Sequence, residues 1–183
     1  MIFTETSLPG VFLVELQPLR DDRGHFARAW CEREFREAGL NPAHAQTNFS
    51  YNESRGTLRG MHFQSAPHEE AKLVRCIRGG IFDVSLDLRP DSPTFLQWYG
   101  AELSAANRTM LYLPEGFAHG YQTLEDDTEV LYQVSTPYAP MAEGGWRWDD
   151  SAFGIEWPIT EGVILSEKDR DWPDYRHPQR NPE

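Results

Sequence analysis

The sequence predicts an all-β protein, a sandwich or barrel of jelly-roll type with a few short helices. Aromatic residues make up 13% of the 183 residues, and 13 prolines and 14 glycines are spread along the chain, which favours short strands joined by tight turns. From residue 46 onward, short runs rich in β-branched and aromatic residues recur between turn signals. Without an internal repeat or a linker, the length predicts a single domain over residues 1–183.

The first half of the chain predicts one strand and one helix. Residues 11–16 form a short apolar run after a Pro-Gly pair, which is typical of a strand, and residues 20–24 indicate a turn carrying two arginines. Residues 30–39 predict a helix, because Cys31, Phe35 and Ala38 fall on one helical face and Gly39 supplies a stop.

The second half predicts a series of strands. Residues 73–77 and 81–88 predict a β-hairpin around a Gly-Gly turn, and the second of these strands alternates apolar with polar residues. The segment after residue 135 is irregular but rich in tryptophan, so we expect it to pack over the barrel. Further strands are predicted at residues 95–99, 101–103, 110–113, 121–124 and 128–134.

Charge and cysteine usage restrict the function. A net charge of −12 argues against nucleic-acid binding, and an anionic ligand would need a locally basic pocket. The two cysteines form no CxxC pair and are too few for a secreted disulfide scaffold. With neither a signal peptide nor an apolar run that approaches a membrane span, the sequence predicts a cytoplasmic protein with no membrane partner.

The segment from Arg59 to Lys72 brings three reactive side chains close together in the sequence. Arg59 can bind an anion bidentately, His62 can transfer a proton near neutral pH, and Lys72 can stabilise a developing oxyanion. His62 could instead be a core histidine bonded to the backbone, but that role gives no reason for two neighbouring cations. The combination indicates chemistry on a small anionic substrate.

Two further side chains are predicted to point into the barrel. Lys72 shares a strand face with apolar residues, and a buried lysine without an anion is costly, which favours a ligand-facing role. Tyr132 likewise alternates with polar neighbours, although a packed tyrosine bonded to a carbonyl is the alternative. His44, His68 and His177 lie in polar stretches and are predicted to be at the surface.

A metal site is not predicted. Residues 114–119 have the Pro-x-Gly-x-x-His spacing of the second cupin motif, which delivers His119 into the barrel mouth. A metal-binding cupin also needs a His-x-His pair on an earlier strand, and here that place is His62-Phe63-Gln64. With fewer than three obvious ligands, the expected metal and cofactor content is none.

Several motifs in order resemble the dTDP-4-dehydrorhamnose 3,5-epimerase family from about residue 11 to residue 169. The resemblance implies a cupin-type jelly-roll β-barrel. It also implies a homodimer in which N-terminal strands cross to the partner, and an N-terminal strand with no obvious local partner agrees with this. The implied substrate is a nucleoside-diphospho-4-keto-6-deoxy sugar. The matching motifs are Arg-Gly-Met-His-Phe-Gln (59–64), Ala-Lys-Leu-Val-Arg (71–75), Asp-Val (83–84), Asp-Leu-Arg (87–89), Pro-Glu-Gly-Phe-Ala-His-Gly (114–120) and Ser-Glu-Lys-Asp (166–169).

The resemblance also implies roles for individual residues. His62 would remove the protons on C3 and C5, which the C4 ketone acidifies, and Asp169 would orient it. Tyr132 would return a proton from the opposite face, and Lys72 would stabilise the C4 enolate oxygen. The implied substrate-binding residues are Arg23, Gln46, Asn48, Arg59, Lys72, His119, Glu143 and Lys168.

One position departs from the family pattern. Arg28 stands where the family usually has glutamate, and a guanidinium only donates hydrogen bonds whereas a carboxylate accepts them. A different nucleobase preference is one interpretation, and an Arg28 side chain that points to solvent is the other. A 3-epimerase or ketoisomerase, a non-catalytic sugar-nucleotide-binding cupin and, third, a metal-dependent cupin dioxygenase remain as alternatives at this level.

Overall fold

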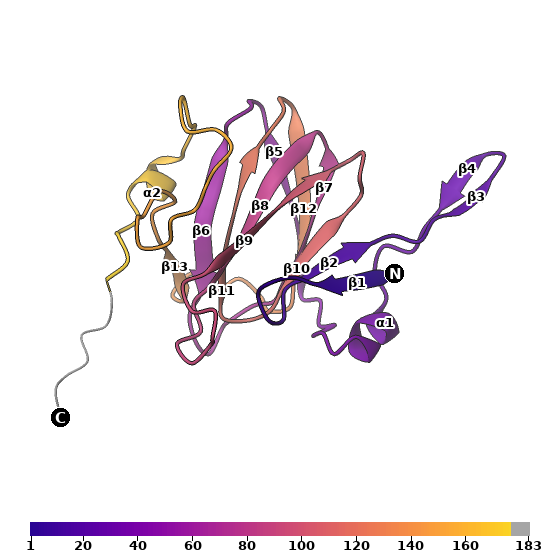
Figure 1. The fold of residues 1–183 in the computed structure, drawn as a ribbon, viewed down its shortest axis with the longest axis horizontal. Helices are drawn as coiled ribbons and strands as arrows, with labels where there is room; N and C mark the ends of the chain where they lie inside the picture. Colours follow the sequence, from indigo (N-terminus) through magenta and orange to yellow (C-terminus); the bar gives the residue numbers. More distant parts are fainter. Residues whose placement is uncertain (177–183) are drawn as a thin grey trace.

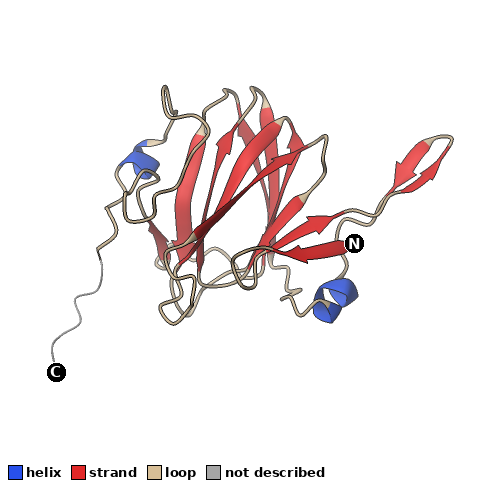
Figure 2. Cartoon of the chain, in the orientation of Figure 1, coloured by secondary structure: helices blue, strands red, loops and turns tan. Residues whose placement is uncertain are grey.

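A computed structural model describes residues 1–176 and confirms the predicted all-β architecture (Figures 1 and 2). Two antiparallel sheets face each other, and a short helix lies on either side of the pair. No helix in the described part of the chain has the length and apolarity that a membrane span requires. The elements are β1 (Ile2–Glu5), β2 (Phe12–Glu15), β3 (Leu19–Asp21), β4 (Gly24–Phe26), α1 (Glu32–Glu37), β5 (Gln46–Asn52), β6 (Leu58–Gln64), β7 (Lys72–Arg78), β8 (Gly80–Asp87), β9 (Trp98–Ser104), β10 (Met110–Leu113), β11 (Phe117–Thr123), β12 (Thr128–Val134), β13 (Glu143–Gly145) and α2 (Glu167–Arg170).

The sheets are assembled from strands that are distant in sequence. One sheet has the order β1-β2-β10-β7-β12-β5, the other has the order β13-β6-β11-β8-β9, and β3 and β4 form a separate hairpin. The hairpin of β3 and β4 extends away from both sheets (Figure 1). The predicted turn at residues 20–24 lies within this hairpin, whose strands were not predicted.

The hairpin predicted from residues 73–77 and 81–88 is wrong. β7 pairs with β10 and β12, whereas β8 pairs with β9 and β11 in the opposite sheet. The turn at Gly79 therefore carries the chain from one sheet to the other. A tight glycine turn can join two strands of one hairpin or two strands of opposite sheets. Burial between the sheets favours the second arrangement here, because Val74 of β7 and Ile81 of β8 pack in one cluster there.

Other strand predictions need smaller corrections. The two strands expected at residues 95–99 and 101–103 are one strand, β9, whose Gly100 leaves room for the Phe82 ring, since a Cβ there would lie 2.2 Å from Phe82 Cζ. The N-terminal strand does find local partners, because β2 pairs with β1 and β10. The strands predicted at residues 110–113 and 128–134 are confirmed as β10 and β12.

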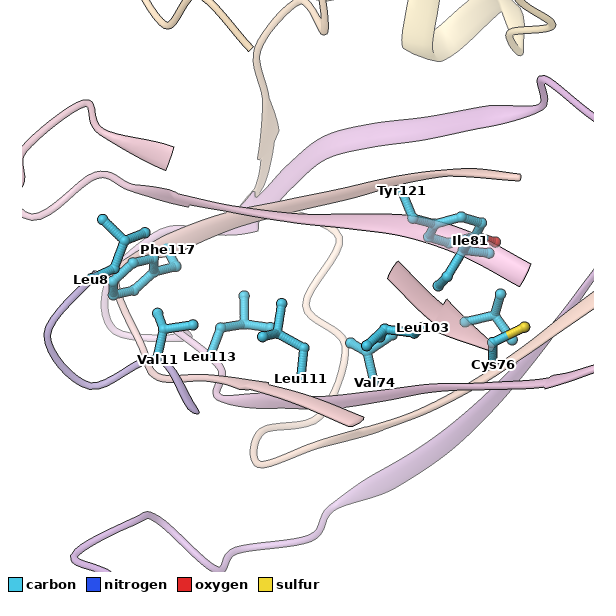
Figure 3. Close-up of a cluster of buried hydrophobic side chains, with 11 residues drawn as sticks. Leu8, Val11, Val74, Cys76, Ile81, Leu103, Leu111, Leu113, Phe117 and Tyr121 are labelled. Carbon is cyan, nitrogen blue, oxygen red and sulfur yellow. The ribbon is translucent and has the colours of Figure 1, made fainter. Parts of the chain in front are cut away.

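The main core lies between the two sheets. Figure 3 shows its side chains directed inward from facing strands. This cluster fills one part of the interior and leaves the remainder to polar side chains. Its buried members are Leu8, Val11, Val74, Cys76, Ile81, Leu103, Leu111, Leu113, Phe117, Tyr121 and Val130.

Both sheets also bury much of their outer faces. Helix α1 covers the six-stranded sheet with Phe35, which is 1% exposed, and its observed bounds lie within two residues of the predicted 30–39. The aromatic segment after β12 covers the five-stranded sheet, where Phe153 and Trp157 pack against Val84 and Leu86 of β8. The expectation that this segment packs over the barrel is confirmed. Burial on both sides explains why β8 is buried along nearly its whole length.

Candidate active site

Two adjoining cavities open between the sheets and share His62, Lys72 and Tyr132. Their volumes are about 260 Å³ and 380 Å³, which together suit a ligand larger than a monosaccharide. His62 comes from the five-stranded sheet, and Lys72 and Tyr132 come from adjacent strands of the other sheet. The first cavity also includes Gln46, Asn48, Glu70, Tyr138 and Glu143, and the second also includes Arg59, His119 and Tyr121.

A break in the ladder between β6 and β11 lets Arg59 and His62 line the same cavity. Residues three apart on a regular strand face opposite sides of the sheet. The register here shifts between His119 and Tyr121, opposite Gly60. A Cβ on Gly60 would lie 2.5 Å from Gly120 Cα, so two glycines permit the close backbone approach at this irregularity. The Arg-Gly-x-His sequence thereby places a guanidinium and an imidazole together.

His62 forms a hydrogen-bonded dyad with Asp169. Its Nε2–H donates to Asp169 Oδ1, which leaves Nδ1 as the ring nitrogen able to accept a proton. Asp169 is 4% exposed, and burial raises the pKa of its carboxyl. Hydrogen bonds and charge from His62, with the Ser166 and Trp172 side chains, outweigh burial and lower that pKa below its ordinary value. Asp169 is therefore charged at neutral pH and holds the imidazole in one tautomer.

The Ser-x-x-Asp sequence explains how Asp169 is placed. Ser166 caps α2: its hydroxyl accepts a hydrogen bond from Asp169 N at 3.0 Å and donates one to Asp169 Oδ2 at 2.9 Å. The carboxylate is thus oriented by the start of a helix that contacts β6. Only the resemblance indicated Asp169 in the sequence, and the cap was the local signal that could have supported it.

A second histidine lies opposite His62 on β11. His119 is 7% exposed, and its Nε2–H donates to Asp83 Oδ1 at 2.8 Å. Asp83 is fully buried in β8 and was not predicted as a site residue, although a carboxylate within a strand buried on both faces was an available signal. Within residues 1–176 no group of three or more His, Cys, Asp or Glu side chains is arranged to hold a metal.

Lys72 and Tyr132 project into the cavity as predicted. Lys72 is 7% exposed, and its ammonium lies 3.2 Å from the carboxylate of Glu70, a partner that the sequence analysis missed. Tyr132 forms no hydrogen bond to another described residue, so the packed tyrosine bonded to a carbonyl is not observed. Burial is the main cause that raises its pKa, which keeps the phenol protonated at neutral pH.

Polar residues line the remaining sides. Arg59 Nε donates to Asn52 Oδ1 at 2.8 Å, and no carboxylate of residues 1–176 pairs with this guanidinium, which leaves it able to bind an anion. Lys168 Nζ donates to Glu143 Oε1 at 2.5 Å, and Tyr138 donates to Glu143 Oε2 at 2.9 Å. Burial raises the pKa of Glu143, but Lys168, Tyr138 and His62 together lower it overall.

The comparisons with known proteins agree with this geometry. The family model described as dTDP-4-dehydrorhamnose 3,5-epimerase matches residues 5–177. This chain belongs to that family. A relative of that name from Sinorhizobium fredii is 43% identical over 94% of this chain and 89% of its own length. The crystal structure of the Elizabethkingia anophelis enzyme has a TM-score of 0.93, with 40% identity over 96% of both chains. The Bacillus anthracis structure, with TDP and PPi bound, has a TM-score of 0.91 and 41% identity over 95% of this chain and 99% of that one.

In this epimerase-family chain, two arginines lie away from the cavities. Arg23 is at the tip of the β3–β4 hairpin, where its side chain is 90% exposed and pairs with Asp21 at 2.6 Å. Arg28, which replaces the family's usual glutamate, pairs with Glu34 of α1 at 2.7 Å. The Arg28 guanidinium is thus half-exposed and paired with a carboxylate, and a different nucleobase preference stays a prediction. Among the three surface histidines, His44 and His68 are exposed, and His177 lies outside the described residues.

Proposed function

We propose that this protein inverts C3 and C5 of dTDP-4-dehydro-6-deoxyglucose through a C4 enolate, giving a dTDP-4-dehydrorhamnose. One observation carries the proposal: an imidazole held by a carboxylate, and a phenol without a hydrogen-bond partner among residues 1–176, line one cavity from opposite sheets. Inversion at a carbon requires a base on one side and an acid on the other. A relative from Legionella pneumophila has been solved in complex with dTDP-4-keto-L-rhamnose.

The proton transfers balance within the cavity. His62 Nδ1 takes the C3 proton, and the C–H electron pair moves into an enolate whose negative charge rests on the C4 oxygen. Lys72 stabilises that oxygen, and a single donor of this kind contributes roughly 10²–10³-fold to the rate. Tyr132 then gives its proton to the carbon from the opposite side, and solvent resets both groups. The same cycle at C5 completes the reaction without a redox step or a cofactor.

The basic pocket that the net charge requires is local. Arg59 supplies a guanidinium for the diphosphate, while Gln46, Asn48 and Tyr138 line the first cavity and offer amide and aromatic surfaces to the nucleoside. We place His119, Glu143 and Lys168 around the same substrate. We propose that all these residues belong to one domain. We also propose that the protein acts in the cytoplasm.

We also infer a homodimer in which the β3–β4 hairpin reaches the partner's cavity. Leu19 and Phe26 of this hairpin are 72% and 70% exposed, an unusual state for large apolar side chains. Strand β5, which carries Gln46 and Asn48, is an edge of its sheet and leaves Phe49 59% exposed. An apolar hairpin and an apolar edge beside the cavity fit each other across two copies of the chain, which would bring Arg23 to the diphosphate.

Proton NMR in D₂O with dTDP-4-keto-6-deoxyglucose tests the reaction. Deuterium at both C3 and C5, with inversion, is the expected result. Deuterium at C3 alone would make this chain a 3-epimerase, like the 3'-monoepimerase from Streptomyces bikiniensis that is 34% identical to it. Absence of exchange on this sugar, and on the same sugar carried by CDP, GDP or UDP, would contradict an enzymatic role and favour a sugar-nucleotide-binding cupin.

A further inference from the structure

Trp172 lies beside the His62–Asp169 dyad, although neither the motifs nor the cavity lining includes it. The chain leaves α2 at Arg170 and places the indole against the imidazole in an edge-to-face contact, with ring centroids 6.3 Å apart and planes inclined by 62°. The ammonium of Lys168 lies 5.7 Å from the centre of the indole ring. The indole thus contacts the base and a residue at the rim of the cavity.

Gly145 provides the space that the indole occupies. It lies directly opposite His62 in the pairing of β13 with β6. A Cβ at residue 145 would be 2.3 Å from Trp172 Cε2 and 2.6 Å from Trp172 Nε1. No side chain larger than hydrogen at residue 145 is therefore compatible with this position of the indole. The glycine and the tryptophan form one packing unit next to the base.

The indole N–H faces the acidic member of the dyad. Trp172 Nε1 is buried and forms no hydrogen bond of standard geometry to another described residue. It nevertheless lies close enough to Asp169 to favour the charged carboxylate, together with His62 and the Ser166 hydroxyl. A buried donor without a full partner is costly, so its position next to this carboxylate calls for an explanation.

We propose that Trp172 is a positioning residue for proton abstraction, with its ring against the His62 imidazole, its buried N–H next to the Asp169 carboxylate, and Gly145 providing the space for the indole. The proposal rests on the proposed function, because it assigns a task to the same base. By restraining two groups of the dyad at once, Trp172 limits imidazole rotation and moderates how strongly Asp169 attracts a proton toward His62.

The variant Trp172→Phe separates the two contacts. Phenylalanine keeps an aromatic ring against His62 and removes only the N–H. Without this donor the Asp169 charge acts more fully on the imidazole, so the pKa of His62 should rise. Because the base must be deprotonated, the acidic limb of the kcat/KM profile should move to higher pH. Mutation of a residue that supports a functional histidine typically changes activity about 10- to 100-fold. We therefore expect kcat to fall about tenfold in Trp172→Phe, with little change in KM.

Other groups around His62 also set its titration and must stay constant between the variants. They are Arg59 from β6, Lys72 from β7, His119 from β11, Tyr132 from β12, Glu143 from β13, and Lys168 and Asp169 from α2. None of them is altered by Trp172→Phe. The matched control is Trp146→Phe, because Trp146 also buries an indole N–H without a partner in the described chain but packs in the aromatic layer with Phe153 and Trp157.

The primary measurement is an NMR titration of the His62 imidazole in the substrate-free protein. This readout does not depend on turnover. If the wild-type protein had no epimerase activity, the proposed function would be refuted, but the titration would still test the Trp172 inference. We expect a higher pKa of His62 in Trp172→Phe and an unchanged one in Trp146→Phe. Gly145→Ala should displace the indole and reproduce the shift, and adding it to Trp172→Phe should give less than the sum of the two effects.

An unchanged His62 titration in Trp172→Phe would overturn the inference. So would equal shifts in Trp172→Phe and Trp146→Phe, because that result would describe a general effect of the aromatic layer. A change confined to KM would also count against it, since a positioning residue acts on the chemical step.

Discussion

At the residue scale, the different surroundings of His62 and Tyr132 suit the two side chains to opposite tasks. His62 has Asp169 on one nitrogen and is thereby prepared to accept a proton on the other. Tyr132 forms no hydrogen bond to another described residue, and burial raises its pKa, so it keeps a proton to donate. The residue pattern predicted both side chains, whereas only the family resemblance indicated that Asp169 orients His62, because this hydrogen bond joins residues far apart in the chain.

The variants His62→Asn and Tyr132→Phe should fail in different ways. His62→Asn removes the base and should abolish both deuterium exchange and inversion, a loss of roughly 10²–10⁴-fold in kcat. Tyr132→Phe keeps the base, which can return a deuteron to the side from which it took the proton. We therefore expect slow exchange at C3 without inversion, followed by NMR in D₂O. Inversion at the wild-type rate in Tyr132→Phe would assign the acid to another group.

Asp87 provides a test of pH-dependent stability. Burial raises its pKa, but hydrogen bonds from Arg89, Ser92 and Thr94 lower it to about 2. A carboxyl whose folded pKa is lowered contributes stability above its unfolded pKa of about 3.9 and loses it as the pH falls towards the folded value. Asp87→Asn should therefore be less stable than wild type by about 2 kcal/mol at pH 7, and the gap should narrow towards pH 2.

Urea unfolding between pH 2 and pH 7 measures that gap. Asp91→Asn is the control, because it removes the same charge from an exposed side chain of the same turn. A gap that stays constant with pH would show that Asp87 does not act through its ionisation.

At the scale of elements, irregularities place the site. β6 brings Arg59 and His62 to one cavity only because its ladder with β11 slips near Gly60. Helix α2 is four residues long and serves mainly to direct Asp169 at β6. The segment 65–71 between β6 and β7 joins opposite sheets, which places Lys72 of β7 across the interior from His62. Short irregular segments therefore determine the geometry that regular strands alone would not give.

Replacement of Gly60 by alanine should be severe. The new Cβ would lie 2.5 Å from Gly120 Cα and 3.0 Å from the His119 carbonyl oxygen, at a backbone φ of +137°. We expect a loss of about 4 kcal/mol or more in the free energy of unfolding, because backbone on backbone cannot relax cheaply. Gly154→Ala is the matched control, since it also has positive φ but meets nothing within 4 Å, and should cost about 1–2 kcal/mol. Equal losses in denaturant unfolding would contradict the close approach.

At the scale of the whole molecule, the projecting hairpin is the feature that a single chain leaves without a function. The hairpin carries Arg23 away from the body of its own chain (Figure 1). The cavity of that chain is lined by Arg59 and Lys72 but not by Arg23. The proposed homodimer would give this hairpin a partner and would add a guanidinium to each site. Because the exchange would be reciprocal, the assembly would have twofold symmetry.

Mixed dimers of two inactive variants test whether Arg23 acts on the partner. Arg23→Ala should lower kcat/KM by about 10- to 100-fold through the lost phosphate contact. When Arg23→Ala and His62→Asn are unfolded, mixed and refolded, each mixed dimer has one intact site, so roughly a quarter of wild-type activity should return.

The control for that experiment is a mixture of His62→Asn and Asp169→Asn, which damage the same chain's dyad and cannot restore a site. Recovery in this control would invalidate the test. If the Arg23→Ala mixture stays inactive although its mixed dimers are present by mass spectrometry, Arg23 does not act across the interface.

The sequence by itself determined the all-β class, the strands at residues 110–113 and 128–134, the family, and the inward direction of Lys72 and Tyr132. These features follow from alternation and local motifs, which a linear pattern records. Only the tertiary structure decided that β7 and β8 belong to opposite sheets, that Asp83 supports His119, and that Trp172 lies against His62. Each of these depends on contacts between residues far apart in the chain, which a linear pattern does not record.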